Sequence, residues 1–60
     1  MASTYIVFKD KKTDQYMAVE DTHDGVYDRL LRDPKVTVLG SPLSATPKDA
    51  IEWVRTILGD

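Results

Sequence analysis

The segment 46–60 carries the strongest structural signal in the chain. Thr46 followed by Pro47 is a typical helix start, because threonine caps the first turn and proline loses nothing at the first helical position. Gly59 is typical of the residue just after a helix. Between them, apolar residues recur at the spacing of one helical face, namely Ala50, Ile51, Val54, Ile57 and Leu58. We therefore predict a helix over 47–58 whose apolar face must pack against the rest of the chain.

Three other segments have the composition of β-strands. Residues 4–8 are apolar or β-branched at both odd and even positions, which predicts a central strand with a helix on each face. Residues 15–20 and 35–39 are predicted as the second and third strands. The polar residues 9–14 predict a hairpin with a charged tip between the first two.

A short first helix is predicted between the second and third strands. Asp21, Thr22 and Asp24 are N-cap candidates. The residue before Pro34 should end the helix. Its apolar face would consist of Val26, Tyr27, Leu30 and Leu31. After the third strand, we expect Leu43 to enter the core.

These elements predict an α+β fold with the order strand, strand, helix, strand, helix. Residues 1–60 are expected to form one small domain, with a three-stranded sheet in the order 2-1-3 covered by two helices. An antiparallel third strand is expected, because a parallel crossover normally needs a dozen or more residues.

Composition narrows the functional classes. The chain has no cysteine, so neither disulfides nor a thiolate zinc site can stabilise it, and a reducing cytoplasmic location is expected. It lacks an apolar run of the roughly 20 residues that span a bilayer, and no membrane partner is expected. Its net charge of -2 argues against a broad, non-specific polyanion binder.

Three groups of residues match the order of motifs in a known small fold. They are Tyr5-Ile6-Val7 at the start, Lys11-Lys12 in the hairpin, and Thr46-Pro47-Lys48-Asp49-Ala50 followed by Trp53-Val54. In these features the chain resembles the hybrid-binding domain at the N-terminus of some ribonucleases H, and more distantly the N-terminal domain of ribosomal protein nine of the large subunit. The resemblance implies the same topology and binding of RNA–DNA hybrids.

Nucleic-acid binding is accordingly one functional hypothesis. Lys9, Lys11 and Lys12 on the hairpin, with Lys35, would contact phosphates, while Tyr5 and Tyr16 would offer a stacking surface. The simpler interpretation is a solvated hairpin tip whose lysines keep the sheet edge from pairing with other chains, and we favour it.

Metal binding and catalysis have less support. Carboxylates and the single imidazole gather around the start of the first helix, at Glu20, Asp21, His23, Asp24 and Asp28. Helix capping explains them better than a cation site does, so no metal or cofactor is expected. One histidine, no cysteine and scattered serines give no nucleophile and base pair, so no enzyme is expected.

Trp53 lies beside the apolar stripe of the last helix, where it is either a rim residue of the core or an anchor for a partner. The preferred hypothesis is a small non-catalytic protein-interaction or regulatory module. It would bind a protein partner or form a homodimer, with Trp53 and Tyr16 as partner-binding residues.

Overall fold

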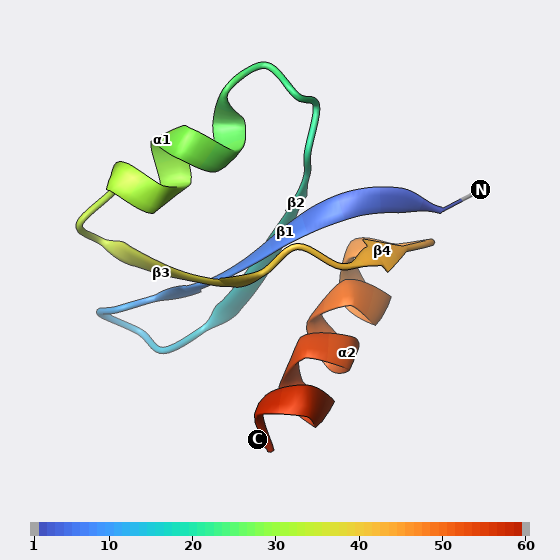
Figure 1. Cartoon of the computed structure of the whole chain (residues 1–60). Helices are drawn as coiled ribbons and strands as arrows, with labels where there is room; N and C mark the ends of the chain where they lie inside the picture. The colour runs from blue at the N-terminus through green and yellow to red at the C-terminus, as the bar shows by residue number, and fades with distance from the viewer. Residues whose placement is uncertain (1, 60) are drawn as a thin grey trace.

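In the computed structural model, which describes residues 2–59, strand β1 (Ser3–Asp10) lies at the centre of the sheet (Figure 1). It pairs antiparallel with β2 (Tyr16–Glu20) on one side and with β3 (Val36–Gly40) on the other. The predicted α+β class, the strand order 2-1-3 and the antiparallel third strand are therefore confirmed.

A short fourth strand, β4 (Leu43–Ser44), was not predicted. It pairs antiparallel with the first residues of β1, and the N–H of Tyr5 donates to the carbonyl oxygen of Pro42 at 2.9 Å. The expectation that Leu43 enters the core is wrong, because its side chain is 71% exposed while Pro42 is buried. Leu43 pairs with Thr4, whose side chain points away from α2 by strand alternation. Strand β4 lies at the end of the sheet far from α1 (Figure 1).

Helix α2 (Pro47–Leu58) begins and ends as predicted. The Thr46 hydroxyl oxygen accepts a hydrogen bond from the N–H of Asp49 at 3.1 Å, and Pro47 is the first helical residue. Gly59 ends the helix at φ 80°, in the left-handed region that favours glycine. Neither helix formed by residues 2–59 has the length and apolar character needed to cross a membrane.

Helix α1 (Val26–Arg32) starts differently from the prediction. Its N-cap is Gly25, at φ 99°, and no side chain caps the first turn. The expected caps make other contacts, since Asp21 accepts the N–H of His23 and Asp24 accepts the hydroxyl of Thr22. The predicted end of the helix is confirmed. The last helical residue is Arg32, and Asp33, which precedes Pro34, has extended backbone angles.

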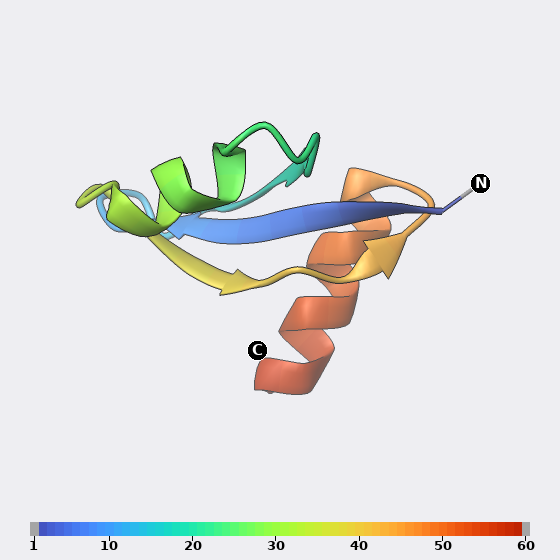
Figure 2. The same cartoon turned by 45° about the horizontal axis from the view of Figure 1, so that its top comes forward.

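The two helices lie on opposite sides of the sheet, with α1 above and α2 below in Figure 2. On the α2 side, Val7 packs with Ala50 and Val54 in a buried cluster. The residues packed around this cluster are Tyr5, Tyr16, Ala18, Leu39 and Ile51. Ile6 and Phe8 are also buried, and their side chains point to the α1 side by strand alternation. The central strand is thus buried on both faces, as its sequence predicted.

Candidate interaction surfaces

The apolar face of α2 continues beyond the part of the helix that the sheet covers. Ala50 and Val54 are buried on this face, whereas Ile57 is 60% exposed and Leu58 is also exposed. Figures 1 and 2 show the reason, because α2 runs away from the sheet toward its C-terminal end. The predicted burial of Ile57 and Leu58 is therefore wrong.

Trp53 lies next to this uncovered face. Its side chain is 54% exposed, so it is not a core residue. It precedes Ile57 by four residues, which places the two side chains as neighbours on the helix surface. Trp53, Ile57 and Leu58 together are called the apolar end of α2 below.

Tyr16, the second residue expected to bind a partner, lies on another side of α2. The Lys9 ammonium is 5.2 Å from the centre of the Tyr16 ring, and the Arg55 guanidinium is 5.4 Å from it. Both distances fit cation–π contacts. Arg55 follows Trp53 by two residues, about 200° around the helix, so Tyr16 and Trp53 belong to different surfaces. The Tyr16 ring therefore makes a contact within the fold, between β2 and α2.

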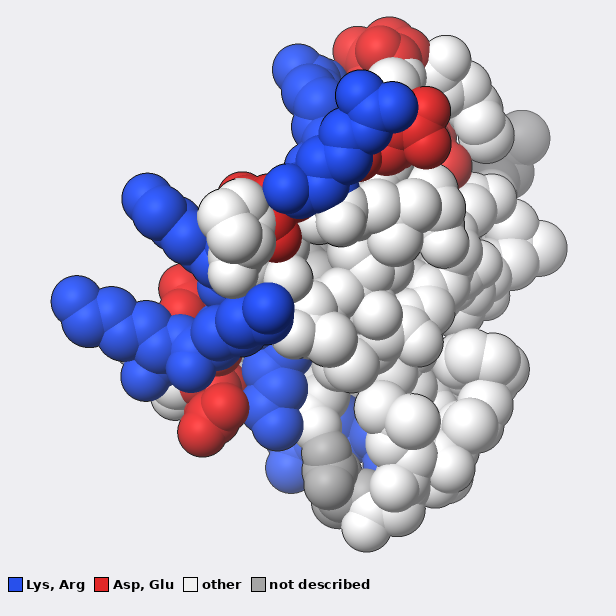
Figure 3. All heavy atoms as spheres, turned by 60° about the vertical axis from the view of Figure 1, so that its left-hand side comes forward, with Lys and Arg blue, Asp and Glu red and all other residues white. Residues whose placement is uncertain are grey.

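Three of the four candidate lysines surround one hollow at the hairpin end of the sheet. Lys11, Lys12 and Lys35, with Asp10, line a hollow of about 460 Å³, which we call the basic hollow. The N–H of Lys11 donates to the carbonyl oxygen of Lys35 at 3.0 Å, so the hairpin is tied to the residue before β3. Lys9 does not line this hollow and lies over Tyr16 instead. Figure 3 shows basic side chains projecting along this side of the molecule, with carboxylates between them.

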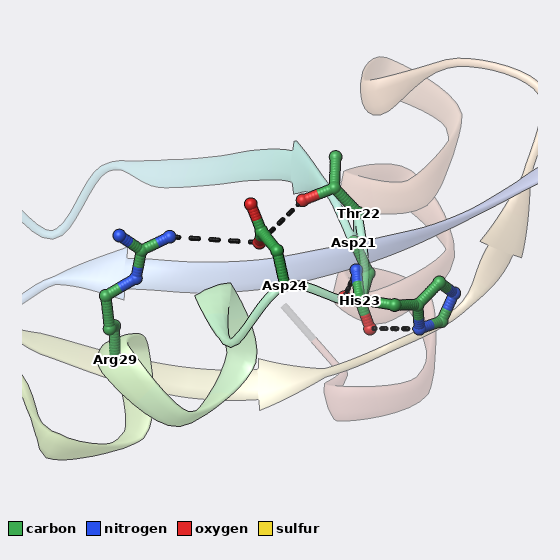
Figure 4. A network of polar contacts seen from close by, with 5 residues as sticks. All are labelled: Asp21, Thr22, His23, Asp24 and Arg29. Atoms are coloured by element: carbon green, nitrogen blue, oxygen red, sulfur yellow. Dashed lines mark hydrogen bonds and ion pairs between the residues drawn. The ribbon is translucent and has the colours of Figure 1, made fainter.

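The acidic loop between β2 and α1 forms a small network of side chains (Figure 4). The Thr22 hydroxyl donates to the Asp24 carboxylate at 2.8 Å, and the Arg29 guanidinium is 3.8 Å from the same carboxylate. The hydrogen bond from Thr22, assisted by the charge of Arg29, holds the pKa of Asp24 below its ordinary value of 3.8. The His23 imidazole is 3.8 Å from the Asp21 carboxylate. Across residues 2–59, no three histidine or acidic side chains are grouped so that they could hold a metal ion.

Replacing Thr22 by valine should raise the pKa of Asp24 toward 3.8, because the largest cause of its lowering is lost. A lowered carboxyl pKa favours the folded state above pH 3.8, and this contribution is lost as the pH falls through the folded value. Titration of the Asp24 carboxyl carbon by NMR measures the shift. Arg29→Gln is the matched comparison and should have the smaller effect, and a larger effect of Arg29→Gln would contradict the assignment.

Comparison of the chain with protein-family models, curated proteins and solved structures finds no match. The resemblance to hybrid-binding domains therefore stays a hypothesis. Two contacts of the sites were not predicted from the sequence, those of Arg55 with Tyr16 and of Arg29 with Asp24. The first joins α2 to β2, and the second joins α1 to the loop before it. Each contact therefore depends on where the helix is placed in the fold.

Proposed function

We propose that this chain is a small, non-catalytic protein-interaction module and that the apolar end of α2 binds a second copy of the chain. The observation that carries the proposal is the continuation of the core-facing stripe past the sheet. Ile57 lies on the same helix face as Val54, yet it is 60% exposed. Exposed apolar surface that is continuous with a core is typical of protein interfaces.

The small hydrophobic core favours a second copy of the chain as the partner. The chain has sixty residues and no cysteine, so disulfides cannot add to its stability. Among residues 2–59, the buried residues of the hydrophobic core are Ile6, Val7, Phe8, Ala50 and Val54, and Pro42 is also buried. Domains of this size are marginal on their own, and association is one of the usual ways in which they gain buried area. Pairing through α2 would extend the cluster that already contains Val54.

An antiparallel pair of α2 helices offers a simple geometry for self-association. Arg55 is the single charged residue between Trp53 and Leu58, and its guanidinium lies over the Tyr16 ring on another side of the helix. In a two-fold antiparallel pair of helices, Trp53 of each copy can contact Ile57 of the other. Stable interfaces bury about 800 Å² per partner, more than three side chains supply, so a weak dimer is expected.

Trp53 is the only tryptophan in the chain, so its fluorescence reports directly on this surface. We expect a dimer with a dissociation constant on the order of 10 µM, and a shift of the Trp53 emission to longer wavelength when the protein is diluted below that value. Sedimentation velocity over the same concentrations gives the association state. A monomer at every concentration, with unchanged emission, would refute self-association.

Trp53→Ala should weaken the dimer by about 2 kcal/mol or more, because it removes a large aromatic side chain from the interface. The denaturation midpoint at low concentration should stay near that of the parent protein, since Trp53 is half exposed. Leu31→Ala is the control, because Leu31 is 55% exposed on α1, on the opposite side of the sheet. Equal loss of association in both variants would contradict an interface on α2.

A non-catalytic role fits the position of the single imidazole. His23 lies on an exposed loop, 3.8 Å from Asp21, and its neighbours there form the surface network of Figure 4. Such a position offers none of the enclosure that a catalytic base normally has.

Nucleic-acid binding is the second candidate, and one observation favours it. Lys11, Lys12 and Lys35, which come from two separate segments, surround the basic hollow. The stacking part of that hypothesis has less support, because Tyr16 packs beside the buried cluster and carries two cations over its ring. Phosphate contacts would therefore dominate such binding.

A further inference from the structure

We propose that the basic hollow is a binding site for a compact anion that carries two or three phosphate groups. This site is independent of self-association through α2, because it is built from the hairpin and the residue before β3. It would add a ligand-binding role to a chain whose overall charge is -2.

The position of the three lysines is fixed by the backbone. Lys11 and Lys12 follow β1 at the hairpin tip, and Lys35 directly precedes β3. The hydrogen bond from the N–H of Lys11 to the carbonyl oxygen of Lys35 holds the two segments together at 3.0 Å. Because this hydrogen bond already joins the two segments, the backbone does not have to bring them together when an anion binds.

Two carboxylates close in sequence to these lysines accept hydrogen bonds from the backbone. Asp10 accepts the N–H groups of Lys12 and Thr13, at 2.8 and 3.2 Å. Asp33 accepts the N–H of Lys35 at 2.9 Å. In the part of the chain that the structure describes, the ammonium groups of Lys11, Lys12 and Lys35 form no ion pair with a carboxylate. Three cations are thus available to an incoming anion.

The lining of the hollow indicates the class of ligand. Its volume of about 460 Å³ lies within the range of small-molecule sites. The residues that line it are three lysines and one aspartate, without an aromatic ring on which a base could stack. Recognition by charge alone suits phosphate groups, which accept hydrogen bonds from several ammonium groups at once. The charge of three ammonium groups around one hollow matches that of a chain of two or three phosphates.

Binding is tested with inorganic tripolyphosphate at low salt, followed by the amide shifts of the ¹⁵N-labelled protein. We expect saturable shifts at Lys11, Lys12 and Lys35. Lys11→Ala combined with Lys12→Ala should weaken binding about tenfold, and Lys35→Ala about threefold, as partly exposed ion pairs are lost. Lys48→Ala is the matched control, because Lys48 lies in the first turn of α2 and does not line the hollow. Its affinity should equal that of the parent.

The source of the phosphates is distinguished by a second probe, a short DNA duplex at equal phosphate concentration. Tighter binding of the duplex, with a salt dependence that falls by roughly two charge units in the Lys11 and Lys12 double variant, would identify a nucleic-acid backbone as the ligand of the hollow. Equal or tighter binding of tripolyphosphate would identify a small phosphate compound. Absence of shifts with both probes, or the same loss in Lys48→Ala as in the double variant, would overturn the proposal.

Discussion

Val54→Asp is expected to unfold the chain. Val54 is buried in the cluster with Val7 and Ala50. It also lies close to Gly40, because a Cβ atom added to Gly40 would be 3.6 Å from Cγ2 of Val54. A carboxylate at this position has no cationic partner in the cluster. Burying it costs several kcal/mol, against a total stability of about 3–5 kcal/mol for a domain of this size. Circular dichroism should show no cooperative thermal transition.

Ile57→Asp provides the control on the same helix. Ile57 follows Val54 by three residues but is 60% exposed, so at concentrations where the parent protein is monomeric its replacement should leave the thermal transition close to that of the parent. The same substitution should abolish the proposed dimer, because it places a charge in the apolar end of α2. A folded Val54→Asp variant would show that the buried side of α2 has been assigned wrongly.

The ends of α2 could be predicted from the sequence because helix capping is local. Thr46 and Gly59 act through groups no more than four residues away, as the contacts to Asp49, Arg55 and Thr56 show. The start of α1 was less predictable, although the contacts that decide it are also local. Several residues of the loop could cap this helix. Asp21 and Asp24 instead accept hydrogen bonds from other residues of the loop.

The extent of burial could not be predicted from periodicity alone. Ile57 has the helical spacing of a core residue, but the path of α2 away from the sheet leaves it uncovered. Leu43 follows a turn and is apolar, yet its pairing with Thr4 turns it away from α2. Both outcomes depend on where the sheet ends, which is a property of the whole fold.

The two candidate sites differ in how far the sequence could specify them. Lys11 and Lys12 are neighbours on a predicted hairpin, but Lys35 joins them only because β3 runs antiparallel beside β1. Trp53 could be placed beside the apolar stripe of α2, while its partial exposure depends on the tilt of that helix. Tyr16 and Trp53 were both expected to bind a partner. The structure places them on different sides of α2, because the guanidinium over the Tyr16 ring belongs to Arg55, about 200° around the helix from Trp53.

Ile6→Ala should cost about 2–5 kcal/mol of folding stability, which is comparable to the whole stability of the domain. Ile6 is fully buried in the central strand, and its side chain points to the α1 side of the sheet. By contrast, no residue of α1 is buried, and Leu31 on that helix is 55% exposed. Leu31→Ala should therefore cost less than about 1 kcal/mol.

Urea denaturation of both variants measures this difference, with the amplitude of the transition showing whether Ile6→Ala is folded without denaturant. The expected result places the core of the α1 side on β1, with α1 as a cover that loses little when one of its apolar side chains is shortened. Similar losses in the two variants would contradict that division. They would show that α1 stabilises the sheet as strongly as the central strand does, and that its exposed leucine contributes to the core in solution.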